Sequence, residues 1–293
     1  MPTLFLTIGV LAVSAAPLLI RLAEPVPPLL IAASRVALAA IVLALLSGKQ
    51  WIEIVRLRPR EQGLIVVAGL ALAAHFGLWI ASFPLTSTSA SVALVATQPV
   101  FAGLLGYLFI GEGFRRQELV GVGLALTGSL VLAGGDLGGG SSDAILGDAL
   151  ALGGAAMVPV YLLAGRVLGN KIPILPYLSA VNAVAGIALV GLAMASGLSM
   201  EGAAAVLGQE EVLALLGLGL LCSVVGHTSL NYCVRLVPVH LVSLGILVEP
   251  VVATLSTWLL LGEVPNAHTL VGGAVIIIGI YVGFGWQPST DQH

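Results

Sequence analysis

Apolar runs of about 20 residues, the length that crosses the hydrocarbon core of a bilayer as a helix, follow one another along almost the whole chain. Charged residues make up only 9% of the sequence. Soluble domains contain roughly 25%, so this chain cannot cover a water-facing surface with polar groups. The runs do not alternate with period two, which favours helices over the strands of a membrane barrel. The sequence therefore predicts an all-α integral membrane protein.

Ten of these runs are long enough to be transmembrane helices. They cover residues 3–21, 28–47, 63–83, 86–110, 117–134, 145–167, 174–196, 212–233, 240–261 and 269–286. The third and fourth runs are separated only by Pro84 and Leu85, which predicts a tight antiparallel hairpin. The net charge of −3 gives no reason to expect binding to nucleic acid. The lipid bilayer is thus the partner that composition requires.

Basic residues are concentrated in alternate loops. Nine of the 11 Lys and Arg lie in the connections on one side of the predicted spans, namely Lys49, Arg56, Arg58, Arg60, Arg115, Arg116, Arg166, Lys171 and Arg235. Arg21 lies in a loop on the other side, and Arg35 lies inside a span. The positive-inside rule then places the basic loops in the cytoplasm. We expect both termini there as well, in a multi-pass protein of a bacterial inner (plasma) membrane.

The second half of the chain repeats the first. Gln98-Pro99-Val100 recurs as Glu249-Pro250-Val251, and Gly111-Glu112 recurs at the same offset as Gly262-Glu263. Each half contains an odd number of spans, five, so the two halves must enter the membrane in opposite orientations. Inverted repeats are characteristic of secondary transporters, which bind substrate near the bilayer midplane where the repeats meet.

The repeat divides the chain into two domains. The first repeat covers residues 1–134 and the second covers residues 145–286. A flexible Gly/Ser-rich linker, residues 135–144, is predicted between them. Residues 287–293 are left as a short cytoplasmic tail.

The repeated block from proline to Gly-Glu, residues 99–112 and 250–263, resembles the drug/metabolite transporter superfamily, in particular its ten-helix EamA-type permeases. The glycine-bearing spans that follow each block and Ser34-Arg35 fit the same pattern, so the resemblance covers almost the whole chain. It implies two inverted five-helix repeats and a secondary transporter of small metabolites or drugs that works by alternating access. Export and proton coupling are further hypotheses, and the resemblance leaves the substrate open.

Glu249 is the candidate for proton coupling. An ionisable side chain inside a span costs about 2.5 to 3.5 kcal/mol on translocon scales, so each one calls for an explanation. Glu249 lies near the middle of its span, and Pro250 after it removes a backbone donor. We interpret Glu249 as a protonatable or cation-binding group that faces a central cavity. The alternative is a structural carboxyl bonded to a neighbouring helix. Gln98 is its counterpart in the first repeat and keeps the polarity without the charge.

Two matched pairs of side chains are further candidates for the cavity. His75 with Trp79, and His227 with Asn231, are four residues apart and so share a helix face. They are interpreted as substrate-binding or proton-shuttling residues, with hydrogen bonding between helices as the alternative. The repeat predicts His75 and His227 on opposite sides of the midplane. Trp79 and Tyr161 are candidates for stacking on a planar or cationic ligand, against simple packing.

Arg35 and a set of glycines have structural interpretations. The long side chain of Arg35 is expected to snorkel to the headgroups or to form an ion pair, rather than to contact substrate. Gly121 and Gly128 in the fifth span, and Gly279 and Gly283 in the tenth, allow two helix backbones to approach closely. The two helices would meet inside the bundle or across a dimer interface, so the chain is expected to be a monomer or a homodimer.

Two other classes of function are an intramembrane enzyme and a membrane scaffold without transport. The sequence contains no HExxH motif and no Walker A motif, and we expect no metal and no cofactor. A scaffold would need large domains outside the membrane, whereas the predicted loops are short. A cavity lined by Trp, Tyr, His and Asn suits a small organic solute such as an amino acid, a nucleoside or an organic cation.

Overall fold

The computed structural model describes residues 2–133, 141–198, 202, 205–261, 264–265 and 267–284. Within these residues every regular element is a helix, which confirms the predicted all-α class. Most of the predicted linker, the Gly262-Glu263 pair and the tail at 287–293 lie outside the described residues.

The helices of the first half follow the predicted spans. They are α1 (Pro2–Val13), α2 (Ala16–Leu22), α3 (Pro28–Ser47), the 3-10 helix η1 (Gly48–Trp51), α4 (Ile52–Val55), α5 (Pro59–Ser82), α6 (Thr88–Val95), α7 (Gln98–Ile110) and α8 (Arg116–Ala133). The helices of the second half are α9 (Ser142–Leu168), the 3-10 helix η2 (Gly169–Lys171), α10 (Ile174–Ala195), α12 (Gln209–Gly217), the π-helix η3 (Leu218–His227), α13 (Thr228–Val234), α14 (Val239–Ile246), α15 (Glu249–Leu261) and α16 (Ala267–Phe284).

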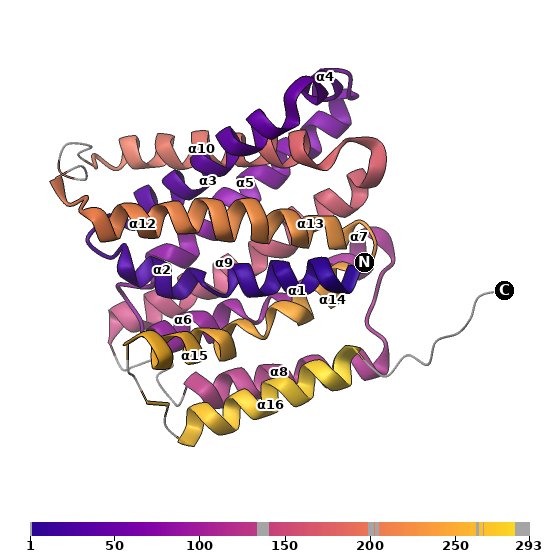
Figure 1. Ribbon diagram of the computed structural model, residues 1–293. Coiled ribbons are helices and arrows are strands. Elements are labelled where there is room, and N and C mark those ends of the chain that lie inside the picture. Colours follow the sequence, from indigo (N-terminus) through magenta and orange to yellow (C-terminus); the bar gives the residue numbers. More distant parts are fainter. Residues whose placement is uncertain are drawn as a thin grey trace.

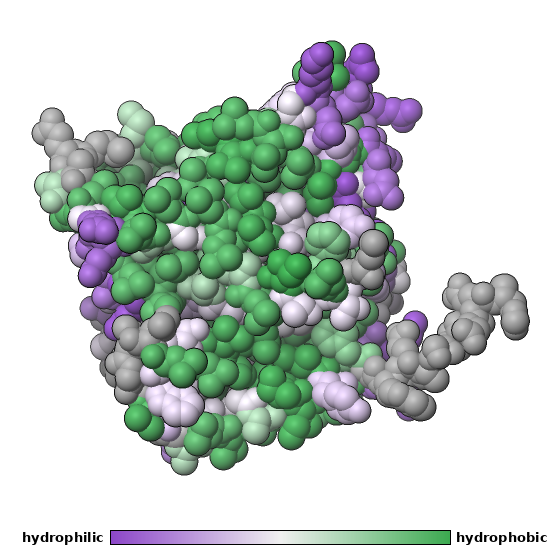
Figure 2. Space-filling model, in the orientation of Figure 1, coloured by the Kyte–Doolittle hydropathy of each residue, from purple (hydrophilic) through white to green (hydrophobic). Residues whose placement is uncertain are grey.

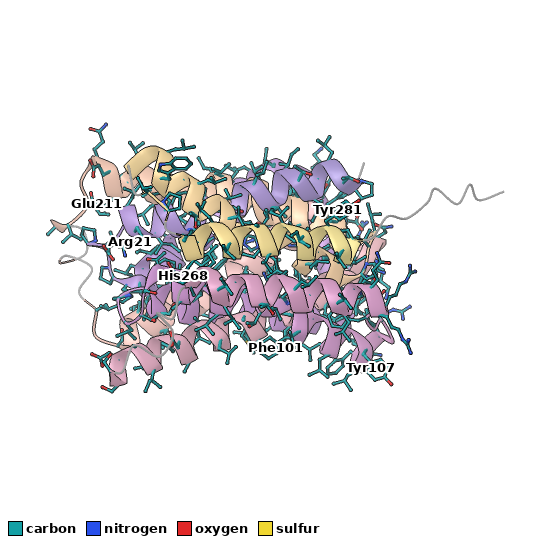
Figure 3. The ribbon with its side chains drawn as sticks, turned by 90° about the horizontal axis from the view of Figure 1, so that it is seen from below. Arg21, Phe101, Tyr107, Glu211, His268 and Tyr281 are labelled. Carbon is teal, nitrogen blue, oxygen red and sulfur yellow. The ribbon has the colours of Figure 1, made fainter. Side chains whose placement is uncertain are left out.

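Nine helical segments of the described chain are long and apolar enough to cross a membrane. They correspond to all the predicted spans except the fifth, which is α8. This helix begins with the polar residues Arg116, Gln117 and Glu118, which lower its mean hydropathy. Its apolar remainder nevertheless packs along α16, which is one of the nine segments. Figure 3 shows these two helices side by side.

The helices form a single bundle whose outer face is apolar. In Figure 1, α3, α5 and α10 lie together at one side of the bundle, and α8 and α16 lie at the opposite side. Apolar side chains cover the face of the helices, and hydrophilic ones gather near the ends of the bundle (Figure 2). Leu45, Ile187 and Phe109 are 77%, 75% and 72% exposed. Such a surface suits lipid rather than water.

The basic loops meet at one end of the bundle, here named the basic end. Lys171 pairs with Glu61 at 3.3 Å, and Arg235 donates to the carbonyl of Ile172 at 2.9 Å. These contacts join the start of α5 to the loops after η2 and α13. Arg21 lies at the other end of the bundle, here named the far end. In Figure 3, Arg21 and Glu211 mark the far end, and Tyr107 and Tyr281 mark the basic end.

Proline interrupts three of the spans partway through the bundle. The breaks lie between α1 and α2, α6 and α7, and α14 and α15. Pro17, Pro99 and Pro250 are the second residues of the helices that follow. A proline is tolerated in the first turn of a helix because it has no N–H to leave unpaired. A fourth span contains the π-helix η3, a feature often found at functional sites.

The small residues of α8 and α16 pack against each other inside the chain. A methyl group added to Gly121 would overlap the backbone of Gly283, and one added to Gly128 would overlap the backbone of α16 near Gly272. These contacts show that the two helices are antiparallel and nearly touch. The glycine faces that the sequence assigned to the bundle or to a dimer are therefore used within the bundle.

Candidate functional site

A small cavity lies at the level of the helix breaks and is lined by both halves of the chain. Its volume is about 30 Å³, which is room for about two water molecules. Six polar or amphipathic side chains contribute to its wall: Arg35, His75, Trp79, Gln98, His227 and Glu249. Five of these six were predicted as cavity residues, and they come from four different spans.

The proline breaks open onto this cavity. Each proline lacks the amide that would donate to the carbonyl four residues earlier in a regular helix. Those carbonyls belong to three residues of the cavity wall, namely Val13, Val95 and Ile246. The breaks therefore add backbone polarity to a wall that is otherwise formed by the interior of apolar helices.

Gln98 and Glu249 occupy matching positions in the two halves. Gln98 is the first residue of α7, and Glu249 is the first residue of α15. They are 3% and 6% exposed, and the Oε1 atom of each is buried with no hydrogen-bond partner among the residues that the structure describes. A carboxylate at the N-terminus of a helix is favoured by the helix dipole. Each repeat thus places one unsatisfied acceptor at its own helix break.

Arg35 belongs to the cavity, and the expectation that it snorkels or forms an ion pair is wrong. The residue is 1% exposed, and its Nε donates to the hydroxyl of Ser223 at 3.1 Å. Its guanidinium lies 3.8 Å from the centre of the Phe76 ring. The helix α3 packs against α10 and η3, so this side chain points inward, where an aromatic face and a hydroxyl take the place of a carboxylate. Its Nη1 remains buried without a partner.

The His75–Trp79 pair lies on one face of α5, as its spacing predicted. The two rings stack with their centroids 5.6 Å apart. The Nδ1 of His75 lies 3.0 Å from the carbonyl oxygen of Gly154. Because a carbonyl can only accept, Nδ1 carries the proton and donates it in this bond. The Nε1 of Trp79 is buried and has no partner, so a second donor faces the cavity region.

The residues of the second predicted pair, His227 and Asn231, lie in different places: His227 is in the cavity wall and Asn231 is not. His227 lines the cavity, and its Nδ1 is buried without a partner. Asn231 and Tyr161 are outside the cavity wall and behind His227. The side-chain amide of Asn231 donates to the hydroxyl of Tyr161 and, at 2.8 Å, to the carbonyl of His227. The hydroxyl of Tyr161 is therefore held by another helix, and stacking of its ring on a ligand stays a prediction.

His75 and His227 both line the central cavity, and their placement on opposite sides of the bilayer midplane stays a prediction. Phe76 lies between them, with its ring 4.7 Å from His75 and 5.3 Å from His227. The two histidines thus form part of one site.

A larger cavity, of about 300 Å³, lies on the far side of the central one. It is lined by α2, α6 and α15, about one helical turn beyond the residues of the central cavity. Arg21, Ser87, Thr88 and Thr254 give it polar groups, and Arg21 donates to the hydroxyl of Thr88 at 3.1 Å. We name this cavity the vestibule. Pro17 and Pro250 in its wall directly follow Ala16 and Glu249 of the central cavity, so the two cavities are neighbours.

Polar contacts tie the helices together at the basic end. Arg166 of α9 pairs with Glu112, which follows α7, at 2.5 Å. The same guanidinium donates to the carbonyl of Val234, the last residue of α13, at 3.2 Å. Three helices are thereby linked on the side of the central cavity that is opposite the vestibule.

Sequence reasoning did not select Arg35, Phe76 or Ser223 for the site. The available signal was an arginine within a span that has no acidic residue at helical spacing on its own helix. Because snorkelling satisfies most arginines near the ends of spans, that signal alone did not separate a cavity residue from an interfacial one.

The chain matches a transporter family and proteins named as transporters in sequence, and it matches a solved structure in fold. The model of the EamA-like transporter family matches residues 1–134 and 145–284. An uncharacterized transporter of Archaeoglobus fulgidus is 28% identical over 86% of this chain and 80% of its own length. A probable terminal-alkyne amino-acid exporter of Streptantibioticus cattleyicolor is 28% identical over 84% of this chain and 80% of its own. A crystal structure that is 18% identical superposes with a TM-score of 0.80 over 96% of both chains, which shows a shared fold.

Proposed function

The chain belongs to the EamA-like transporter family, and from this we propose that it carries small organic solutes across the bilayer by alternating access. It is a multi-pass membrane transporter and not an enzyme. The observation that carries the proposal is the meeting of unsatisfied polar side chains from both halves in one buried cavity. In a bundle surrounded by lipid, such groups are costly unless a solute uses them.

The helix breaks supply the moving parts of this mechanism. A half-helix can change its angle at a break with few backbone torsions, and three breaks surround the cavity. Here the vestibule lies on the far side, and the Arg166–Glu112 pair joins helices at the basic end. With the basic loops in the cytoplasm, as proposed from their charge, this arrangement faces outward. The inward-facing arrangement would separate Arg166 from Glu112, in keeping with the inverted repeat.

Glu249 is the proposed coupling group. A charged carboxylate with a buried, unpartnered oxygen pays a desolvation penalty of several kcal/mol, on the order given by continuum estimates. A proton or a cationic group of the solute would remove that penalty. Exchange of a proton for solute at this carboxyl would couple transport to a pH gradient, and this is the form of coupling that we propose.

The solute is proposed to be a small polar organic molecule of the amino acid, nucleoside or organic cation class. The cavity wall offers aromatic faces together with both donors and acceptors of hydrogen bonds. The name of the Streptantibioticus cattleyicolor relative supports a small solute and supports export.

The test is a flux measurement on purified protein in liposomes. Radiolabelled amino acids, nucleosides and organic cations are offered with and without a pH gradient, and protein-free liposomes give the background. We expect saturable flux of at least one class, which the gradient accelerates. Folded protein that moves none of these solutes would reject transport and favour the scaffold class.

A further inference from the structure

We propose that the central cavity is a site for a zwitterion, in which Arg35 binds the carboxylate and Glu249 binds the ammonium group of the same solute. This proposal rests on the proposed function and deepens it, because it selects one solute class. It also gives Arg35 the role of a specificity-determining residue.

Two opposite charges share the central cavity without meeting. Arg35 and Glu249 both line it, and they are 1% and 6% exposed. No salt bridge joins Arg35 to Glu249 or to another carboxylate in the described part of the chain. The Nη1 of Arg35 and the Oε1 of Glu249 are buried without hydrogen-bond partners. The guanidinium of Arg35 and the carboxyl group of Glu249 therefore each keep a buried polar atom for a solute to bind in the same cavity.

The guanidinium of Arg35 is held in one orientation by its neighbours. Ser223 accepts from Nε, and Phe76 covers one face of the guanidinium. These contacts fix the plane of the group and leave its terminal nitrogen Nη1 unused. An arginine fixed in this way presents N–H donors in the planar geometry that matches a carboxylate.

Acceptors gather elsewhere in the same cavity wall. An ammonium group has three N–H donors and no acceptor. Glu249 and Gln98 each offer a buried Oε1 that has no partner among the described residues. The indole of Trp79 lies in the same wall, where its face can also attract a cation. These groups match an ammonium better than a second anion.

Each single-charge alternative leaves one group unsatisfied. An anion would satisfy Arg35 and leave Glu249 without a partner, unless a proton occupied that carboxyl. A cation would satisfy Glu249 and leave the guanidinium unpaired. The cavity now has room for about two waters, so the charged groups of a solute would displace them, and its side chain would extend toward the vestibule of about 300 Å³.

The proposal is tested by removing one charge of the solute at a time. The twenty common amino acids are screened for binding to the purified full-length protein by calorimetry and for flux in liposomes. The best one is compared with the amine that lacks its carboxylate and with the acid that lacks its amino group. We expect the amino acid to bind at least about 100-fold more tightly than either analogue, because each analogue leaves a buried charged group unpaired.

Two variants test which residue binds the carboxylate of the solute and which binds its ammonium group. Arg35→Gln should remove the preference for the amino acid over the amine, and Glu249→Gln should remove its preference over the acid. Arg35→Gln should still bind the amine, and Glu249→Gln should still bind the acid. Such binding shows that the variant is folded. Arg116→Gln and Glu210→Gln remove the same charges from exposed positions and should keep both preferences. If Arg35→Gln does not fold, Arg35→Lys keeps the charge without the planar fork and should weaken the amino acid more than the amine.

Flux of nucleosides or organic cations without binding of any amino acid would overturn the zwitterion site and leave the transport function intact. The zwitterion site is likewise overturned if Arg35→Gln and Glu249→Gln both keep the wild-type preferences. Absence of flux for every solute would instead overturn transport, and with it this proposal.

Discussion

At the scale of single residues, Glu249 is the group on which coupling to protons is proposed to depend. In Glu249→Gln the side chain keeps its shape and polarity but can no longer exchange a proton. We expect the variant to lose accumulation driven by a pH gradient while it retains solute exchange at solute concentrations high enough to offset its weaker binding. The measurement is flux into liposomes at two internal pH values. Glu210→Gln, at the exposed start of α12, is the matched control. Full gradient-driven accumulation in Glu249→Gln would contradict the assignment.

Asn231 and His227 should give different results when each is changed to alanine. His227 lines the cavity, so His227→Ala should raise the apparent KM. Asn231 bonds to Tyr161 behind the wall, so Asn231→Ala leaves a buried hydroxyl without its donor and should cost about 1–3 kcal/mol of stability. Flux kinetics and thermal unfolding in detergent separate the two effects. Equal changes in KM with no loss of stability would show that Asn231 contacts solute directly.

The sequence reasoning at this scale succeeded where symmetry and polarity agreed. Gln98 and Glu249, matched by the repeat, do lie in one cavity, and so do His75 and His227. Arg35 was misjudged because its surroundings depend on Phe76 and Ser223, which lie on other helices. Contacts between spans that are far apart in sequence cannot be read from the spacing within one span. The functional roles of all these residues stay predictions.

At the scale of helices, the close contact between the glycine faces of α8 and α16, here called the seam, leads to a prediction about stability. A methyl group on Gly121 would overlap the backbone of Gly283, whereas one on Gly123 would meet nothing. Gly121→Ala should therefore cost about 1–3 kcal/mol through overpacking. Gly123→Ala should leave stability unchanged or raise it by up to about 1 kcal/mol, because alanine is the better helix former. Thermal unfolding of the two variants in detergent is the measurement. Equal stability of the two would show that this seam does not hold the helices together.

Some helix breaks can be read from the sequence, and others cannot. Pro99 and Pro250 mark two of them, since a proline removes a backbone donor wherever it occurs. The π-helix η3 has no such marker, because its shape depends on packing against α1 and α3. The polar start of α8 also explains why its span is the least apolar of the set.

At the scale of the whole molecule, the arrangement of the basic loops predicts the orientation in the membrane. Cys222 and Cys233 are both buried, so the native chain gives a low background for thiol labelling. We expect Glu24→Cys, at the far end, to react with an impermeant maleimide in intact cells. Arg56→Cys, at the basic end, should react only after permeabilisation. The reverse pattern would overturn the assignment of the basic end to the cytoplasm.

The all-helical class follows from length and composition, because apolar runs in lipid have few alternatives to helices. The transporter family was identified by the resemblance of the repeated block at residues 99–112 and 250–263, not by composition. The size of the central cavity could not be predicted in this way. It depends on how closely the side chains of several helices fill the space between them, and the sequence does not contain that volume.

The small volume of the central cavity bears on the behaviour of the idle protein. A continuous file of water between the two aqueous sides would let ions run down the gradients that the cell maintains. Space for about two molecules, with the Arg166–Glu112 link toward the basic end, interrupts such a file. We therefore expect the solute-free protein to conduct no ions, so that liposomes containing it keep a pH gradient as long as protein-free liposomes do.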